Sequence, residues 1–329
     1  MRIAVFSTKT YDKDYFEKYQ EQYAHDFSYF ETQLNRKTAG LTAGFQGVCV
    51  FVNDKLDADT IGILAENKVA LIALRCAGYN NVDLAAARKH QIKVVRVPAY
   101  SPEAVAEHAL ALILTLNRKT HKAYNRIREG NFSLNGLIGF NLFKKTVGVI
   151  GTGQIGATFC KIMKGFGCKI IAFDIAKSKE LIALGVEYHD LENVFRFSDI
   201  ISLHCPLIPA TKHIIKKQSL DQMKDGVMII NTSRGALINT TDVLAALRDK
   251  KVGYLGIDVY EQEENLFFMD LSESIIQDDD ILRLNSFPNV LITSHQAYFT
   301  REAMDEITIT TLKNIAAFSS GTPLINEVK

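Results

Sequence analysis

Three glycines follow a short apolar run, and their spacing is the clearest sign of chemistry in the chain. The run at residues 146–150 leads into GTGQIG, a GxGxxG pattern that then opens a helix. The first glycine allows a tight turn, the second lets a pyrophosphate approach the backbone, and the third lets the helix pack on the strand. The helix N-terminus offers unpaired N–H groups to phosphates. The residues predicted to hold the dinucleotide here are Gly151, Gly153, Gln154, Ile155 and Gly156.

An acidic residue ends the next apolar run. Asp174 follows residues 169–173 and lies 18 positions after Gly156. A carboxylate at this spacing is expected to bind the hydroxyl groups of the adenosine ribose. The next two residues are apolar and Lys177 is the first cation, so the sequence predicts NAD rather than NADP. The alternative is a structural βαβ turn that carries no cofactor.

Arginine, glutamate and histidine side chains follow three later apolar runs. Arg234, Glu263 and His295 each come shortly after a predicted strand, and catalytic groups of dinucleotide-binding sheets lie at such strand ends. An arginine fork holds a carboxylate, and a histidine protonates a carbonyl oxygen as hydride arrives. A carboxylate on the other imidazole nitrogen keeps the histidine available as an acid. The set suits a 2-keto acid reductase, although Glu261 and Glu264 leave the register of the glutamate open.

Composition excludes several other classes of function. Hydrophobic residues make up 47% of the chain, charged residues 23%, and the net charge is +1, so neither a nucleic acid nor an anionic membrane is an expected partner. The chain lacks HExxH and paired Cys/His spacings, so no metal site is expected. It also lacks GxSxG and the P-loop pattern, which argues against serine hydrolases and nucleotidases.

Cysteine usage and hydropathy predict a cytoplasmic protein. The five cysteines are scattered with no CxxC pair, which favours free thiols in a reducing compartment. The N-terminus has the pattern of a first strand rather than of a signal peptide. The most apolar long stretch, residues 104–116, is too short to span a bilayer.

Short apolar runs alternate with helical patterns along the chain. This βαβ alternation is typical of parallel sheets covered on both faces. Four of the runs precede the glycine turn, so we expect them to form a separate sheet. The runs predicted as strands are residues 3–6, 47–52, 70–74, 93–97, 147–150, 169–173, 200–203, 227–231, 253–258 and 290–293.

The length of 329 residues favours two domains, because single cores stop growing near ~250–300 residues. Ser101 can cap a helix that begins at Pro102 and runs to about Arg128. A last helix at residues 301–319 can return to the first domain. We therefore expect an α/β fold of two Rossmann-like or flavodoxin-like domains with parallel sheets, with cofactor and substrate in the cleft between them. The predicted domains are a discontinuous substrate-binding domain, residues 1–100 plus 299–329, and an NAD-binding Rossmann domain, residues 101–298.

These motifs resemble the D-isomer-specific 2-hydroxyacid dehydrogenase family, and within it the fermentative NAD-dependent D-lactate dehydrogenases. The resemblance covers essentially the whole chain, and the NTSRG, DVYExE and HQA segments together are highly specific. The stretches that carry it are RCAGYNNVDL (75–84), VRVPAYSPEAVAEHALALILTLNR (95–118), VGVIGTGQIG (147–156), SLHCPL (202–207), MIINTSRGALIN (228–239), GIDVYEQEENLFF (256–268) and TSHQAYFT (293–300).

The resemblance implies a role for each candidate residue. Arg234 binds the substrate carboxylate and polarises the carbonyl, Glu263 pairs with the histidine, and His295 is the general acid/base. The family often has an asparagine where this chain has Thr211. Further substrate contacts are implied at Cys76, Ala77, Gly78, Tyr79, Tyr100, Tyr298 and Phe299. Further cofactor contacts are implied at Cys205, Pro206, Thr211, Thr232, Ser233, Arg234 and Asp258.

The predicted function is the reversible, NADH-dependent reduction of pyruvate to D-lactate. The D configuration of the product and a homodimeric or homotetrameric state are implied only by the resemblance. One alternative is a bulkier 2-keto acid substrate, because small changes in a pocket set that preference. The alternative from another class is a non-catalytic NAD(H)-sensing protein, like the corepressors built on this fold.

Overall fold

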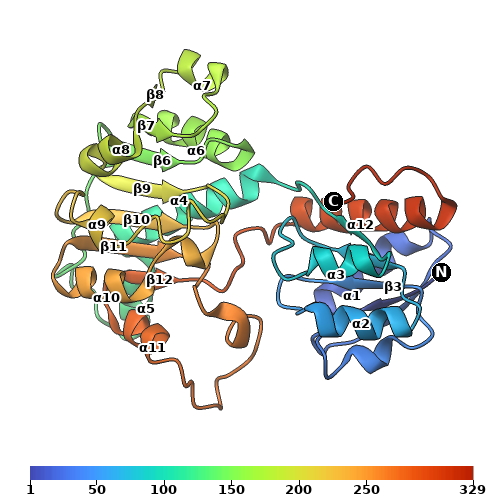
Figure 1. Cartoon of the computed structure of the whole chain (residues 1–329). Helices are drawn as coiled ribbons and strands as arrows, with labels where there is room; N and C mark the ends of the chain where they lie inside the picture. Colours follow the sequence, from blue (N-terminus) through green and yellow to red (C-terminus); the bar gives the residue numbers. More distant parts are fainter. Residues whose placement is uncertain (329) are drawn as a thin grey trace. The chain divides into compact units, whose positions relative to one another are not determined.

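The computed structural model describes residues 1–328, and the chain divides into two compact units. Unit 1 comprises Met1–Ser101 together with residues 299–328, and unit 2 comprises Pro102–Tyr298. Each unit is built on one sheet in which every paired strand is parallel. The expectation of an α/β fold with two Rossmann-like domains is therefore confirmed (Figure 1).

Unit 1 contains a five-stranded sheet in the order β2-β1-β3-β4-β5. One face is covered by α1 and α12, whose Phe16, Leu312 and Ile315 pack with apolar side chains of the strands. Strand β2 was not predicted, because its sequence DFSY is mixed and only partly buried at the sheet edge. The strands are β1 (Arg2–Val5), β2 (Asp26–Tyr29), β3 (Gly47–Val50), β4 (Leu71–Leu74) and β5 (Lys93–Arg96). The helices are α1 (Thr10–Gln20), η1 (Ala39–Thr42), α2 (Ala58–Glu66), α3 (Leu84–Lys89) and α12 (Arg301–Ser320).

Unit 2 contains a seven-stranded sheet in the order β12-β11-β10-β9-β6-β7-β8. From β6 the chain proceeds to β7 and β8 on one side and then returns to β9 on the other. The strand order therefore reverses between β6 and β9, and such a switch point is where doubly wound sheets bind ligands. The strands are β6 (Thr146–Ile150), β7 (Lys169–Phe173), β8 (Glu187–Tyr188), β9 (Ile200–Leu203), β10 (Val227–Asn231), β11 (Val252–Ile257) and β12 (Val290–Ile292).

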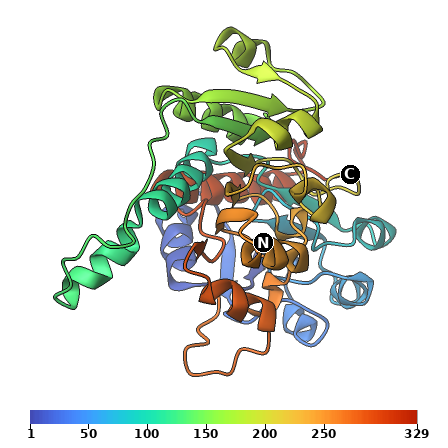
Figure 2. The same ribbon diagram turned by 90° about the vertical axis from the view of Figure 1, so that its left-hand side faces the viewer.

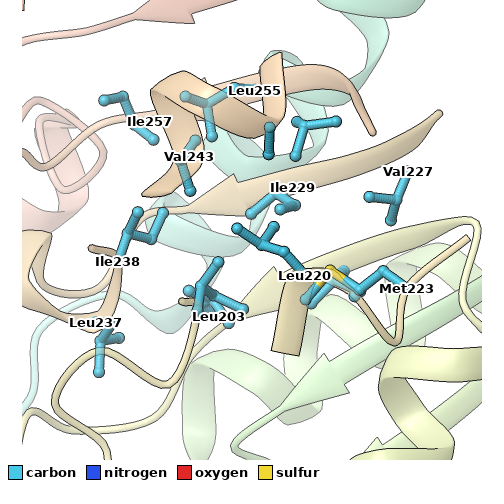
Figure 3. Close-up of a cluster of buried hydrophobic side chains, with 14 of the residues drawn as sticks. Leu203, Leu220, Met223, Val227, Ile229, Leu237, Ile238, Val243, Leu255 and Ile257 are labelled. Atoms are coloured by element: carbon cyan, nitrogen blue, oxygen red, sulfur yellow. The ribbon is translucent and has the colours of Figure 1, made fainter. Parts of the chain in front are cut away.

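Helices cover both faces of the unit 2 sheet. Apolar side chains of α4 and α6 form the core on one face, and those of α8, α10 and α11 form it on the other. Figure 3 shows part of the second core, where Val243 of α10 lies near Leu255 and Ile257 of β11. The helices are α4 (Pro102–Arg118), α5 (Thr120–Arg128), α6 (Gln154–Gly165), α7 (Lys179–Ala183), α8 (Leu191–Phe197), α9 (Lys217–Leu220), η2 (Gly235–Leu237), α10 (Thr240–Arg248), η3 (Glu263–Asn265) and α11 (Asp279–Ser286).

The single long helix predicted after Pro102 is two helices. Lys119 adopts φ 53°, a left-handed conformation that interrupts the helix, so α4 ends at Arg118 and α5 begins at Thr120. None of the helices within residues 1–328 has the length and apolar character needed to span a bilayer.

Candidate active site

The glycine turn at the end of β6 forms a backbone cradle. Gly151 has φ +93°, and a Cβ at this position would lie 2.6 Å from the backbone nitrogen of Cys205. A Cβ on Gly156 would lie 2.0 Å from the carbonyl oxygen of Gly151, so α6 starts directly against the turn. By contrast, a Cβ on Gly153, the N-cap of α6, would meet nothing within 4 Å. The turn therefore leaves open space at the N-terminus of α6, where its unpaired N–H groups face outward.

Asp174, at the end of β7, is fixed beside this turn. Its Oδ2 accepts hydrogen bonds from the Thr152 N–H at 2.5 Å and the Thr152 hydroxyl at 3.1 Å, and its Oδ1 accepts one from the Ala176 N–H at 3.0 Å. Burial by itself would raise the pKa of Asp174, but these hydrogen bonds lower it below its ordinary value. Asp174 is therefore an oriented anion, as expected for a residue that accepts hydrogen bonds from ribose hydroxyls.

Other predicted cofactor residues lie on the loops after β9 and β10. The hydroxyl of Ser233 donates to the carbonyl of Cys205 at 2.7 Å, which ties the two loops together. Burial raises the pKa of the Cys205 thiol to about 11, so this residue is a neutral thiol. Thr211 turns its hydroxyl to the carbonyl of Pro206 at 2.6 Å. The hydroxyl of Thr232 is buried without a hydrogen-bond partner.

The residues present fit a dinucleotide. The open cradle at Gly153 leaves room for a pyrophosphate, Asp174 is an anion fixed beside that cradle, and the orphaned Thr232 hydroxyl offers a polar group that a ligand would satisfy. Within residues 1–328 no group of three or more His, Cys, Asp or Glu side chains is placed to hold a metal ion.

Arg234 follows β10 on a loop that its neighbours hold in place. Its Nη1 donates to the carbonyl of Ser233 at 2.7 Å, and its own carbonyl accepts a hydrogen bond from the Asn231 side chain at 2.8 Å. A guanidinium has five N–H donors, so one contact to Ser233 leaves most of the fork for an anion. The side chain is thus restrained but able to bind a carboxylate.

Glu263 and His295 form a hydrogen-bonded pair. Glu263 Oε1 lies 2.8 Å from His295 Nδ1, and Glu263 Oε2 accepts a hydrogen bond from the Tyr260 N–H at 2.9 Å. The carboxylate is therefore anchored on one side and orients the imidazole on the other. The rings of Phe268 and Tyr298 lie near the imidazole, with centroids 5.8 and 6.5 Å away. Of the three glutamates at positions 261, 263 and 264, Glu263 is therefore the one that contacts His295.

Asp258 holds the turn that presents His295. It is 1% exposed, and its carboxylate accepts hydrogen bonds from the Thr293 hydroxyl and from the backbone N–H groups of Gln296 and Ala297. Its carbonyl accepts the His295 N–H at 2.7 Å, and His295 itself has φ 53°. Both carboxylate oxygens thus serve the turn, while the predicted contact of Asp258 with the cofactor stays a prediction.

The remaining substrate candidates lie in unit 1 or at its boundary. In the Cys76–Tyr79 loop, which follows β4, the Ala77 carbonyl accepts a hydrogen bond from Arg96 at 2.7 Å, and the Arg96 guanidinium also lies over the Tyr79 ring. The Cys76 sulfur lies 3.2 Å from the Gly78 carbonyl oxygen. The Phe299 ring packs edge-on against Tyr11. The substrate roles of this loop, and those of Tyr100, Tyr298 and Phe299, stay predictions.

Two features near the site were not predicted. Phe268 lies beside His295, but an aromatic residue in a loop carries no signal of chemistry in the sequence. His213 pairs with Glu261, with Nε2 and Oε1 2.5 Å apart. The acidic run after β11 gave a partial signal, since it holds more glutamates than the one predicted to pair with His295.

Comparison with known proteins identifies the family. The sequence profile "D-isomer specific 2-hydroxyacid dehydrogenase, NAD binding domain" matches residues 110–297. D-lactate dehydrogenase of Escherichia coli is 50% identical over 328 residues, covering 100% of both chains. The 2-hydroxyacid dehydrogenase homolog 1 of Schizosaccharomyces pombe is 52% identical, covering 97% of both. The structure of the pyruvate reductase of Chlamydomonas reinhardtii superposes with a TM-score of 0.93 at 45% identity, covering 99% of this chain and 98% of that one. The predictions of family and of NAD as cofactor are confirmed, and the chain belongs to the D-isomer-specific 2-hydroxyacid dehydrogenase family, with its NAD-binding domain in unit 2.

Proposed function

We propose that the protein is an NAD-dependent enzyme that reversibly reduces pyruvate to D-lactate. The observation that carries the proposal is the His295–Glu263 pair, which joins the segments after β12 and β11 in an NAD-binding domain. The names of the Escherichia coli and Chlamydomonas relatives support pyruvate and D-lactate as the substrates, because both relatives match this chain over nearly its whole length.

The proposed reaction uses three side chains of unit 2. NADH, when bound, supplies the hydride that reduces the carbonyl carbon. Arg234 binds the substrate carboxylate through the part of its guanidinium that Ser233 does not occupy. The Nδ1–H of His295 donates a hydrogen bond to Glu263, which leaves Nε2–H of the imidazolium to give its proton to the carbonyl oxygen and the imidazole neutral afterwards. In the reverse direction the neutral Nε2 accepts the hydroxyl proton of lactate.

The buried Thr232 hydroxyl and the Gly151–Gly156 cradle would hold the cofactor. Asp174 would bind the adenosine ribose and disfavour a 2′-phosphate by charge repulsion, so NADH is the expected coenzyme rather than NADPH. All five cysteines are free thiols, which agrees with a reducing compartment such as the cytoplasm.

The proposal is tested by steady-state oxidation of NADH with pyruvate, compared with 2-ketobutyrate, 2-ketoisocaproate and phenylpyruvate. We expect the highest kcat/KM with pyruvate, and chiral analysis of the product should give D-lactate. A higher kcat/KM with the branched or aromatic acid would show that the enzyme acts on a bulkier 2-keto acid than pyruvate. NADH binding without turnover of any of the four acids would favour the non-catalytic NAD(H)-sensing protein.

The protein is also proposed to form a homodimer or homotetramer through unit 2. Helix α5 has no buried residue, and the segment that follows it exposes large apolar side chains, among them Phe132, Leu134 and Ile138. We call residues 120–143 the arm; Figure 2 shows α5 (cyan-green) reaching away from the sheet of its own unit and the chain after it returning to that sheet. Apolar exposure on such an extension favours burial against a second copy of the chain.

A further inference from the structure

The segment after β11 carries two histidine–glutamate pairs rather than one. Glu263 pairs with His295, whereas Glu261, two residues earlier, pairs with His213 at 2.5 Å. The second pair has no place in the proposed proton transfer. Its contacts lead instead to the loop that carries Arg234.

Glu261 joins three separate parts of unit 2. Its Oε1 meets His213, and its Oε2 accepts hydrogen bonds from the N–H of Thr240 at 3.2 Å and from the Thr240 hydroxyl at 3.0 Å. Burial by itself would raise the pKa of Glu261, but these hydrogen bonds lower it below its ordinary value, so the residue is an anion with both oxygens engaged. We call His213, Glu261 and Thr240 the latch.

The backbone around His213 is paired with the end of the Arg234 loop. The His213 N–H donates to the carbonyl of Ala236 at 2.9 Å, and the Ile215 N–H donates to the carbonyl of Leu237 at 3.0 Å. The Asn239 N–H donates back to the carbonyl of Ile215 at 2.9 Å. His213 itself has φ 53°, so this segment is bent to bring its side chain onto Glu261.

The start of the same loop lies directly against the segment of Glu261. A Cβ on Gly235 would lie 2.1 Å from the Tyr260 carbonyl carbon and 2.5 Å from the Glu261 nitrogen. Residues 235–240 are therefore held by backbone contact at one end and by Thr240 at the other, with the His213 segment alongside. Arg234 immediately precedes this stretch, so the direction of its side chain depends on where the loop is held.

We propose that the His213–Glu261–Thr240 latch is a positioning device that fixes the Arg234 loop for binding of the substrate carboxylate. The inference rests on the proposed function only in taking Arg234 as the group that binds this carboxylate. His213 and Glu261 are positioning residues, because they act through Arg234 and not on the substrate. The latch therefore affects the KM for the keto acid more than the KM for NADH.

The test compares His213→Ala with His213→Gln in the full chain. Both variants place an L side chain at φ 53°, but only glutamine keeps an N–H donor for Glu261. We expect His213→Ala to raise the KM for pyruvate about fivefold to tenfold, because the charged hydrogen bonds of Arg234 to the substrate carboxylate would be misaligned. The KM for NADH should change less than about twofold. His213→Gln should restore most of the pyruvate affinity.

Hydrogen exchange gives a readout that does not depend on turnover. Backbone amides of residues 234–240 should exchange faster in His213→Ala than in the wild type and regain protection in His213→Gln. If the wild type fails to reduce pyruvate while these exchange rates change as expected, the proposed substrate is wrong, but the role of the latch in holding the Arg234 loop is supported. If His213→Ala does not fold, Thr240→Val removes one hydroxyl contact to Glu261 and should change both readouts in the same direction.

A matched control is present at the far edge of the sheet. His189 Nε2 lies 3.4 Å from Glu187 Oε2 beside β8, and its side chain is 33% exposed, close to the 27% of His213. His189→Ala should leave both KM values and the exchange of residues 234–240 unchanged. Equal effects of His189→Ala and His213→Ala, or unchanged KM for pyruvate and unchanged exchange in His213→Ala, would overturn the proposal.

Discussion

Glu263 contributes a charge as well as an orientation to His295. Glu263→Gln keeps the hydrogen-bonding shape of the side chain but removes the anion that stabilises an imidazolium. We expect kcat for pyruvate reduction to fall about tenfold in Glu263→Gln and about 10²–10⁴-fold in His295→Ala, since general acid catalysis is worth that much. Initial rates and an NADH fluorescence titration check this, and the Kd for NADH should be unchanged in both variants.

The acidic run itself provides the control for this prediction. Glu264 is exposed and adjacent to Glu263. Glu264→Gln removes the same charge from the same segment and should leave kcat near the wild-type value. A loss in Glu264→Gln as large as that in Glu263→Gln would mean that the general field of the acidic run matters, and not the contact with His295.

His204 makes the stability of unit 2 depend on pH. Its ring lies at a tilt against Phe159, its Cβ is close to Gly156 of the glycine turn, and burial lowers its pKa from 6.5 to about 3. The folded state keeps His204 neutral, whereas the unfolded chain binds a proton below pH 6.5. Its contribution to stability is therefore fully present above pH 6.5 and is lost progressively as pH falls towards 3, at about 1.4 kcal/mol per pH unit.

The measurement is the free energy of unfolding in urea at pH 7.5 and at lower pH for the wild type and His204→Gln, which keeps a polar group for Ser202 but does not titrate. We expect the variant to be less stable at pH 7.5 because packing is lost. The gap between the two proteins should narrow as pH falls below 6.5. A gap that stays constant with pH would contradict the neutral, buried state of His204.

At the scale of elements, the turn after β12 depends on one buried carboxylate. In Asp258→Asn the amide nitrogen replaces an oxygen that accepts a hydrogen bond, so at least one donor of the 293–297 turn loses its partner. Each buried donor left unpaired costs about 1–3 kcal/mol. We expect a lower Tm and a lower kcat, because His295 lies inside this turn at φ 53°. Thermal unfolding and initial rates check both.

Asp270→Asn is the matched comparison for this turn. Asp270 also accepts hydrogen bonds from a backbone N–H and a hydroxyl, both of Ser272, but the bonds are exposed. Asp270→Asn should therefore change Tm and kcat very little. The predicted difference between the two asparagine variants therefore comes from burial, and equal effects would show that the Asp258 network does not hold the turn.

The elements that the sequence predicted well are those with a buried apolar run. Strands β9 and β10 are buried along their whole length, and their hydrophobic runs predict them directly. β8 has only two residues and was missed, because so short a bridge leaves no pattern. The helix break at Lys119 was also missed, since no glycine or proline marks it. Local sequence therefore locates core strands better than edges and interruptions.

In the candidate site, too, some features could be predicted from the sequence and others could not. Glycine spacing predicted the cofactor, and the residues after the strands supplied the proposed catalytic set, because both depend on local order along the chain. The partners of the glutamates did not follow from local order: His213 and Glu261 are 48 positions apart, and His295 and Glu263 are 32 apart. The Glu263–His295 pairing was implied only by the family resemblance, and the His213–Glu261 pairing was not predicted, because both depend on how the loops after β9, β11 and β12 pack in the folded chain.

At the scale of the molecule, the arm predicts self-association. Leu134 and Ile138 are 81% and 85% exposed, and an isolated chain would keep this apolar surface in water. We expect the wild type to sediment as a dimer or larger oligomer, and the double variant Leu134→Asp/Ile138→Asp to shift to the mass of one chain. The charges would be buried without partners in the interface, which costs more than the apolar contacts gain.

Analytical ultracentrifugation of wild type and variants measures this directly. Ile325→Asp is the control, because Ile325 is 94% exposed but lies in unit 1, outside the arm. It should keep the mass of the wild type, since a single exposed isoleucine on another surface is ordinary for a soluble protein. Circular dichroism should show that both variants are folded. A wild type that sediments as one chain, or a double variant that keeps the wild-type mass, would contradict association through the arm.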